Sequence, residues 1–207
     1  MLQNKPVLML HEIDDNIFKI DLEKYILTFD DGLYSQYMLI DRLCEINTPK
    51  YFFISTNIVC DEDINQSTDI VACTAAHQRH FNYKINDYYM KWSDIKDLKS
   101  RDDCYIGGHG HTHACYIGQN IPFKHIIQDT NQMLITFKRE LNYSPRAFCY
   151  PYNYTTGGYS EFLRTKGIHT IFGSDRLDCK QLLSEQALYQ NDMVIHNAKW
   201  NENTDNY

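Results

Sequence analysis

Seven short apolar runs recur along the chain, and longer stretches with helix-like spacing of apolar residues separate most of them. The runs cover residues 6–11, 25–29, 50–55, 104–107, 146–150, 169–173 and 193–196. Their length and their content of β-branched and aromatic residues are typical of strands. Strands that alternate with helices indicate a parallel sheet, which is either open or closed into a barrel.

Four of the intervening stretches are predicted to be helices. They span residues 33–47, 93–100, 124–141 and 159–167. Pro49 follows the first helix and stops it, Ser93 is a candidate N-cap of the second, and Gly167 is a candidate C-cap of the last. The apolar face of the third helix is predicted to contain Ile127, Leu134, Phe137 and Leu141.

One stretch, around residues 60–90, does not follow this alternation. It is polar, aromatic and long for a connection, so we expect an irregular insert that serves either as a functional loop or as an added subelement. The chain has 207 residues, which favours a single domain over residues 1–207 with enough length to bury a substantial core.

Charge and apolar content limit the possible partners. The formal net charge is −7, and no block of Lys or Arg is present, so we expect no nucleic-acid partner. No apolar run approaches membrane-spanning length, and the first ten residues lack the pattern of a signal peptide. The seven Cys show no paired spacing, which fits reduced thiols. These features together predict a cytoplasmic protein without a transmembrane segment.

Two adjacent carboxylates follow the run 25–29. Asp30 and Asp31 stand at the end of this predicted strand, and Gly32 lets the chain turn there. Neighbouring side chains of an extended chain point to opposite faces, so the two carboxylates can serve two different partners. The carboxyl ends of parallel strands are where α/β folds build their sites. Taken alone, the pair is better explained by one Asp that caps the next helix and one that is solvated.

Three His follow the run 104–107, in the segment GGHGHTHA. His109 and His113 are four residues apart, so one helical turn would place both rings on the same side, and this spacing is common among metal ligands. His111 points elsewhere. The alternative is a polar surface loop that is rich in His, but three of the nine His of the chain within five residues favour a metal site.

Two His and one Asp at strand ends would form an open site with three ligands, as in catalytic zinc sites. A metal there would lower the pKa of bound water and polarise a carbonyl. The second Asp could then act as general base. This arrangement explains the adjacent carboxylates, because one binds the metal and the other takes a proton. The ligand set favours one divalent metal, Zn first, with Co, Ni or Fe as alternatives.

The order of the motifs resembles the NodB-homology polysaccharide deacetylases, also called carbohydrate esterase family four. The resemblance rests on TFDDG (28–32), HGHTH (109–113) and FCYPYN (148–153), with support from MKWSDIKDL (90–98) and PVLMLHEI (6–13). It covers roughly residues 6–200. The family fold is a distorted parallel (β/α) barrel of about seven strands, so the resemblance implies that fold here.

The resemblance also implies individual roles. Asp30 would be the general base, and Asp31, His109 and His113 would be the metal ligands. His196 ends the last apolar run and would be the general acid, although a structural hydrogen bond at a strand end explains it equally well.

Three further residues are implied to bind substrate. Tyr152 and Pro151 belong to the block that forms one wall of the family's groove, where a backbone N–H next to Tyr152 would bind the oxyanion. Trp92 belongs to the helix start that precedes the His motif.

The sequence departs from the family pattern at several positions. Gly110 stands where Ser or Thr usually follows the first ligand, Asn153 replaces a usual Gly, and Cys149 occupies the place of an Arg that steadies the base. Asp175 or Arg176 could take over an orienting role. We interpret Cys149 as a small packing residue rather than a nucleophile.

Three further His residues are not assigned a catalytic or metal-binding role. His77 and His80 have ligand-like spacing but lie in the expected insert, so we expect surface or groove-rim positions. His11 either approaches the site from its strand end or belongs to the core.

The sequence therefore predicts a metal-dependent hydrolase of carbon–nitrogen bonds other than peptide bonds, which removes an N-acetyl or other acyl group from an amino sugar. The partner would be a carbohydrate in surface glycan biosynthesis. One alternative is the same chemistry on a non-sugar amide or formylated amine. Another is a non-catalytic carbohydrate-binding member of the fold, against which the presence of both Asp and both His argues.

Overall fold

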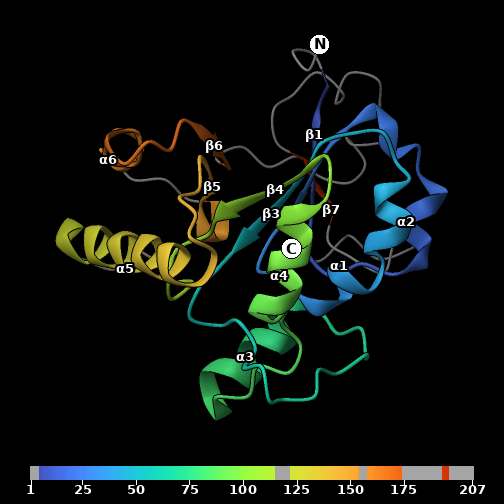
Figure 1. The fold of residues 1–207 in the computed structure, drawn as a ribbon, viewed down its shortest axis with the longest axis horizontal. Coiled ribbons are helices and arrows are strands. Elements are labelled where there is room, and N and C mark those ends of the chain that lie inside the picture. Colours follow the sequence, from blue (N-terminus) through green and yellow to red (C-terminus); the bar gives the residue numbers. More distant parts are fainter. Residues whose placement is uncertain (1–4, 115–121, 154–157, 174–192, 196–207) are drawn as a thin grey trace.

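The fold is built on one parallel sheet of seven strands (Figure 1). The computed structural model describes residues 5–114, 122–153, 158–173 and 193–195. The strands are β1 (Val7–Leu10), β2 (Ile26–Phe29), β3 (Lys50–Ile54), β4 (Cys104–Gly108), β5 (Ala147–Cys149), β6 (Thr170–Phe172) and β7 (Met193–Ile195). Their order is β6-β5-β4-β3-β2-β1-β7, and every paired strand runs parallel to its neighbour. The sheet curls into a half-barrel, which confirms the predicted fold class.

Six α-helices accompany the sheet in the described part of the chain. They are α1 (Tyr34–Met38), α2 (Ile40–Cys44), α3 (Cys73–Tyr83), α4 (Trp92–Ser100), α5 (Phe123–Leu141) and α6 (Tyr159–Thr165). Three short 3-10 helices cover Asp15–Lys19, Leu22–Lys24 and Pro151–Asn153. The single helix predicted over residues 33–47 is two helices, because Leu39 leaves helical geometry with φ −104° and ψ 9°.

Of the two predicted helix caps, one was wrong and the other was right. The N-cap of α4 is Lys91 rather than Ser93, because the Asp94 carboxylate accepts a hydrogen bond from the Lys91 N–H at 2.9 Å. Gly167 does follow the end of α6, with φ +82°.

The buried face of α5 is turned relative to the predicted one. It contains Ile126, Thr130, Met133, Thr136 and Phe137. Of the four residues predicted there, only Phe137 is fully buried. A polar residue can occupy this face because the Thr130 hydroxyl bonds to the Ile126 carbonyl and to the Tyr159 hydroxyl, both at 2.9 Å.

The two faces of the sheet carry different clusters of side chains. On β3, Phe52 and Ile54 belong to the main core with the helices, whereas Phe53 packs with Met9 and Cys149 in a smaller cluster on the opposite face. Both faces are therefore apolar, as expected for a parallel sheet. Polar side chains are concentrated where the strands end.

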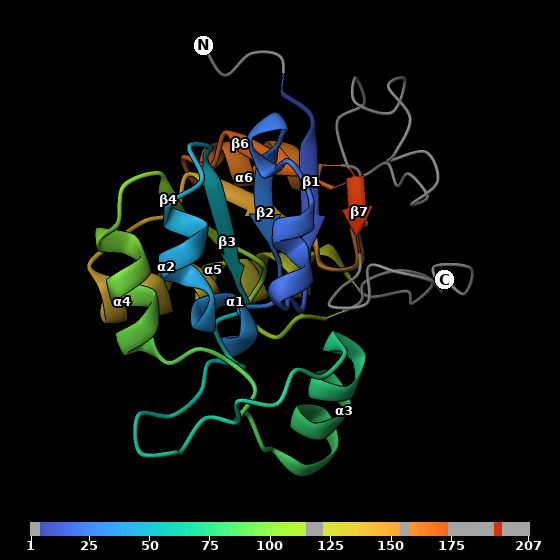
Figure 2. The ribbon, with the colours of Figure 1, turned by 90° about the vertical axis from the view of Figure 1, so that its right-hand side faces the viewer.

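The segment between residues 60 and 90 contains α3, so it is less irregular than the sequence suggested. Ala76 of α3 packs with Leu33, Ile58 and Tyr89 in a separate apolar cluster. Figure 2 shows α3 beyond the carboxyl ends of β1 and β7, away from the other helices. The insert is therefore placed to cover the edge of the sheet where a site was predicted. Among the helices that the structure describes, none has the length and apolarity needed to cross a membrane.

Candidate active site

Asp30 and Asp31 are held at the carboxyl end of β2 by the backbone of the neighbouring strand. The Asp30 N–H donates to the Leu10 carbonyl at 2.9 Å. The buried amide of Gln36 donates to the carbonyls of Asp30 and His11, at 2.6 and 2.9 Å. Asp31 adopts φ 70° in the turn that follows, a conformation that Asp tolerates better than most residues. Both carboxylates are buried, at 2% and 1% exposure.

The His-containing loop begins at the end of β4 and is fixed by a residue of α5. The Asp129 carboxylate accepts hydrogen bonds from the N–H groups of His111 and Thr112, at 2.7 and 3.0 Å, and from the Thr112 hydroxyl at 2.7 Å. Gly110 has φ +76°, and a Cβ atom there would lie 3.0 Å from Asp129 Oδ2. Asp129 thus orders the loop, and its position explains why Gly replaces the usual Ser or Thr.

Replacing Asp129 with Asn should loosen this loop. The amide would keep the shape of the side chain but would accept fewer of the three hydrogen bonds, at a cost of about 1–3 kcal/mol in the free energy of unfolding. Affinity for the metal that the sequence predicts should fall by about 10–100-fold, because support of metal ligands typically has effects of that size. Chemical denaturation and metal titration measure the two effects. Unchanged values in both would show that Asp129 does not order the loop.

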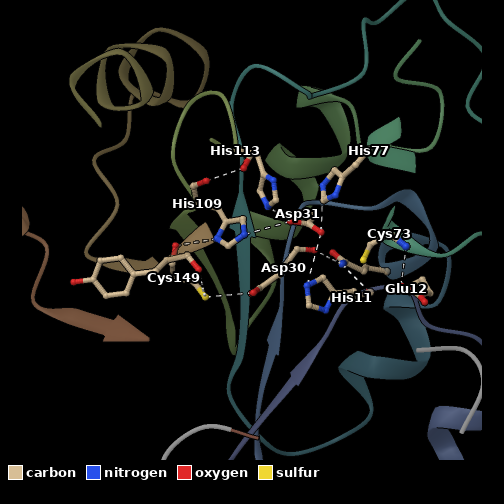
Figure 3. Close-up of polar contacts among 12 residues, drawn as sticks. His11, Glu12, Asp30, Asp31, Cys73, His77, His109, His113 and Cys149 are labelled. Carbon is tan, nitrogen blue, oxygen red and sulfur yellow. Dashed lines mark hydrogen bonds and ion pairs between the residues drawn. The ribbon is translucent and has the colours of Figure 1, made fainter. Parts of the chain in front are cut away.

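Asp31, His109 and His113 converge (Figure 3). Asp31 Oδ1 lies 3.3 Å from His109 Nε2 and 2.9 Å from His113 Nε2. Two atoms bound to one tetrahedral zinc at about 2.0–2.2 Å are about 3.3–3.6 Å apart, so these donors are close to the separation that a metal requires. His113 reaches this position through a backbone with φ 53°. The three predicted ligands therefore form one cluster, here called the first cluster.

The orientation of His109 suits a metal ligand. Its Nδ1 lies 2.8 Å from the Cys149 carbonyl. Because a carbonyl can only accept, Nδ1 carries a proton, and Nε2, which faces Asp31, is the nitrogen that could bind a metal. Imidazoles that bind metals are typically held in this way.

Neighbouring ionisable groups shift the pKa values of Asp31 and His109. Burial raises the pKa of Asp31, but its interactions with the surrounding His rings, His77 first and then His113 and His109, outweigh this effect, and the pKa lies well below its ordinary value. Burial lowers the pKa of His109, yet the charges of Asp30 and Asp31 raise it overall. Asp31 is therefore a carboxylate that attracts positive charge.

Asp30 stands beside the first cluster, in contact with a different residue. The Cys149 thiol donates a hydrogen bond to Asp30 Oδ2 at 3.3 Å, and the donor atoms of Asp30, His109 and Cys149 lie within 4.8 Å of one another. Cys149 is fully buried in the small apolar cluster on β5. It therefore packs, as predicted, and it also contacts the carboxylate that the missing Arg would steady.

The pocket has a second side that sequence reasoning largely missed. The whole pocket has a volume of about 230 Å³. One side is lined by the predicted residues and their neighbours: Asp30, Asp31, His109, His113, Tyr152 and Asn153. On the other side it is lined by His11, Glu12, Cys73 and His77, together with Ala72 and Thr74. Figure 3 shows His77 and His11 approaching Asp31 from the side opposite His109. His11 thus lies at the site rather than in the core.

The expectation for His77 and His80 was wrong. The His77 side chain is only 12% exposed, and its Nε2 lies 3.5 Å from Asp31 Oδ2. Burial lowers the pKa of His77 to about 4, against the opposing charge of Asp31, so the ring is neutral near pH 7. His80 is buried and packs against Phe81 and Tyr89. Both positions depend on α3, which the sequence did not reveal as a helix.

The remaining predicted residues are distributed differently. Tyr152 lines the pocket with 39% exposure, and its ring centroid is 4.8 Å from that of His113. Pro151 is buried beside it but does not line the pocket. Trp92 lies elsewhere, with the edge of its ring against Phe137 in the main core.

The predicted general acid, His196, and the candidate orienting residues Asp175 and Arg176 lie outside the described residues.

Comparison of the sequence with protein families gives one match. Residues 21–171 match the family model described as polysaccharide deacetylase. A search of curated protein sequences finds no significant match.

Three solved structures with a similar fold are distant from this chain in sequence. The deacetylase domain of BpsB from Bordetella bronchiseptica has a TM-score of 0.63 at 14% identity, over 94% of this chain and 96% of that one. IcaB from Ammonifex degensii has a TM-score of 0.58 at 18% identity, over 83% and 84%. The chitin deacetylase of Colletotrichum lindemuthianum has a TM-score of 0.53 at 14% identity, over 94% and 75%. At such identities these likenesses establish the fold.

Proposed function

Because the chain belongs to the polysaccharide deacetylase family, we propose that it is a metal-dependent hydrolase that removes an N-acetyl or other N-acyl group from an amino sugar. The observation that carries this proposal is the position of Asp30 in one pocket with the first cluster of Asp31, His109 and His113. A potential metal site with a separate carboxylate beside it has the parts that hydrolysis of an amide requires.

Asp31, His109 and His113 would hold one divalent cation, Zn²⁺ first and Co²⁺, Ni²⁺ or Fe²⁺ as alternatives. Such a cation supplies a lower pKa for a bound water and polarises the acyl carbonyl. Asp30 would accept the proton of the attacking water as general base. The Cys149 thiol, which donates to Asp30 Oδ2, would hold that carboxylate in orientation.

The groove wall would bind the acyl oxygen. The N–H of Asn153 already donates to the Tyr150 carbonyl at 2.9 Å. The backbone N–H of Tyr152 is therefore the candidate donor to the oxygen as negative charge develops on it. The exposed ring of Tyr152 at the pocket would provide an aromatic surface for a sugar ring. Pro151 would act by fixing the turn, whereas the packing of Trp92 gives no support to direct contact with substrate.

The departing amine needs a proton, and we retain His196 as the predicted donor, with His11 as the alternative at the pocket. His196→Ala should lower kcat, leave metal content unchanged and remove the alkaline limb of the pH–rate profile, because a general acid loses activity as it deprotonates. The same measurement on His11→Ala is the matched comparison. An alkaline limb that survives in His196→Ala and disappears in His11→Ala would assign the acid to His11 instead.

Release of acetate from N-acetylglucosamine oligomers tests the proposal. The metal-loaded protein should release acetate and free amine in equal amounts, a chelator should abolish release, and added Zn²⁺ should restore it. Among the relatives, the fungal one named a chitin deacetylase motivates this probe. Oligomer binding without acetate release would favour the non-catalytic alternative. Release of formate from formylated amines, without release of acetate from the sugars, would favour the alternative in which the substrate is a non-sugar amide or formylated amine.

A further inference from the structure

We propose that a second divalent cation binds on the other side of Asp31, where Asp31 Oδ2, His11, His77 and the thiolate of Cys73 would hold it. These residues other than Asp31 are called the second cluster. A His11 ring bound to this cation could not also give its proton to the departing amine, so the proposal excludes His11 as the general acid and leaves that role to His196. The inference extends the proposed function, on which it rests through the shared carboxylate. The resemblance to the polysaccharide deacetylases assigns no metal to the second cluster.

The two oxygens of Asp31 face different sets of donors. Oδ1 is approached by His109 and His113 at 3.3 and 2.9 Å. Oδ2 is approached by His77 Nε2 at 3.5 Å and His11 Nε2 at 3.9 Å. Neither oxygen accepts a hydrogen bond within the described structure. A carboxylate in this arrangement can bridge two cations, as in two-metal sites with separations of about 3.5–4 Å.

The second cluster has the composition of a metal site. The donor atoms of His11, Asp31 and Cys73 all lie within 4.8 Å of one another. His77 is outside that group, although its Nε2 lies 3.5 Å from Asp31 Oδ2, so its ring would have to move toward the other donors to bind the same cation. Cys73 and His77 are four residues apart on α3, so their side chains project from the same side of the helix. His77 Nε2 is buried and has no hydrogen-bond partner in the described part of the chain. A buried nitrogen left in this way is costly unless a ligand satisfies it.

The charges of the pocket favour two cations. Its lining includes the carboxylates of Glu12, Asp30 and Asp31, and no Lys or Arg among the described residues. One divalent cation with a neutral thiol would leave a net charge of about −1, because three carboxylates face it. A second cation with the Cys73 thiolate brings the sum to about zero, and buried charge is costly when it is not balanced.

The donor set indicates the kind of cation. Thiolate and imidazole ligands together suit Zn²⁺ and Co²⁺ better than Mg²⁺ or Ca²⁺. Binding would replace the thiol proton of Cys73, which passes to solvent. Glu12 supports this geometry from outside the cluster, because its Oε2 accepts a hydrogen bond from the Cys73 N–H at 3.0 Å. The cation would join α3 to the carboxyl edge of the sheet.

Titration of the metal-free protein with Co²⁺ tests the proposal. The wild type should bind two equivalents, counted by elemental analysis, and should develop the ultraviolet charge-transfer band of thiolate-bound cobalt. Cys73→Ser and His77→Ala should each bind one equivalent, and the band should be absent in Cys73→Ser. The equivalent that remains shows that each variant is folded.

Two matched controls sharpen the result. Cys149→Ser should keep both equivalents and the band, which excludes the other thiol near the pocket. His80→Ala, from the same helix, should bind two equivalents like the wild type. One equivalent in the wild type at saturation, or a thiolate band that persists in Cys73→Ser, would overturn the proposal.

The test separates this inference from the proposed function. A wild type that binds one equivalent and still releases acetate would refute the second cation alone. A wild type that binds two equivalents, shows the Cys73-dependent band and releases no acetate would refute the proposed function alone.

Discussion

Asp30→Asn should lose nearly all deacetylase turnover while keeping its metal. The side chain contacts Cys149 and lies in the pocket beside the first cluster, but it is not a member of that cluster. An amide in its place keeps the shape and loses the basicity. General-base catalysis is typically worth about 10²–10⁴-fold, so kcat should fall by about that factor. Acetate release under saturating substrate measures it, and elemental analysis measures the metal.

The matched control is Asp63→Asn, the same chemical change at an exposed position of the insert. It should leave turnover and metal content at wild-type values. If Asp30→Asn kept wild-type turnover with its metal bound, another group would have to be the base. If it lost its metal, Asp30 would be a ligand, and the division of roles between the two carboxylates would be wrong.

The strands were predictable because of the physical nature of a parallel sheet. Both faces of such a sheet are covered, so its strands are largely apolar runs. In β3 (Lys50–Ile54), for example, only Tyr51 is not fully buried. Helix detail was harder to predict, since it depends on tertiary contacts. The buried position of Thr130 requires the hydroxyl of Tyr159, which lies in a different helix.

The first cluster was predictable for a related reason. Strands of one parallel sheet end at the same edge, so Asp31 after β2 and His109 after β4 must come close together in space, although they are far apart in sequence. Asp129 and Gln36 gave no comparable signal, because a helix residue that supports a loop has no characteristic spacing from it. Their roles become visible only when α5 and α1 are packed against the sheet.

The second cluster was hidden for a different reason. His77 and Cys73 lie on a helix whose hydrophobic anchor is the small cluster around Ala76 and Tyr89. That packing, and not any pattern near β2 or β4, brings them to Asp31. The spacing of Cys73 and His77 is the one signal in the sequence that could have indicated a shared function.

The replacement of the usual Arg by Cys149 bears on both proposals. An Arg next to Asp30 would contribute a permanent positive charge to the pocket. Cys149 donates a hydrogen bond but brings no charge in its thiol form. No Lys or Arg of the described lining balances the carboxylates, so the absence of the family's Arg is consistent with the second cation that we propose.

Asp31→Asn is the variant that should have the largest effect on the metal. In the proposed arrangement Asp31 is the one carboxylate that contacts both clusters, so its neutralisation should weaken both cations. Even a hydrogen-bonding partner of a ligand typically contributes about 10–100-fold in metal affinity, and direct loss of a ligand should exceed that. Acetate release should disappear with the metal. Titration with Co²⁺ measures the affinity, and circular dichroism confirms the fold.

Comparison with His113→Ala separates a shared carboxylate from a single site. Of the two carboxylate oxygens of Asp31, the structure pairs His113 with Oδ1. His113→Ala should therefore lose one equivalent and keep the band from Cys73, whereas Asp31→Asn should lose both. If the two variants each lost one equivalent and both kept the band, Asp31 would belong to the first cluster alone. The second cluster would then bind its cation without the carboxylate, and the bridging role would be wrong.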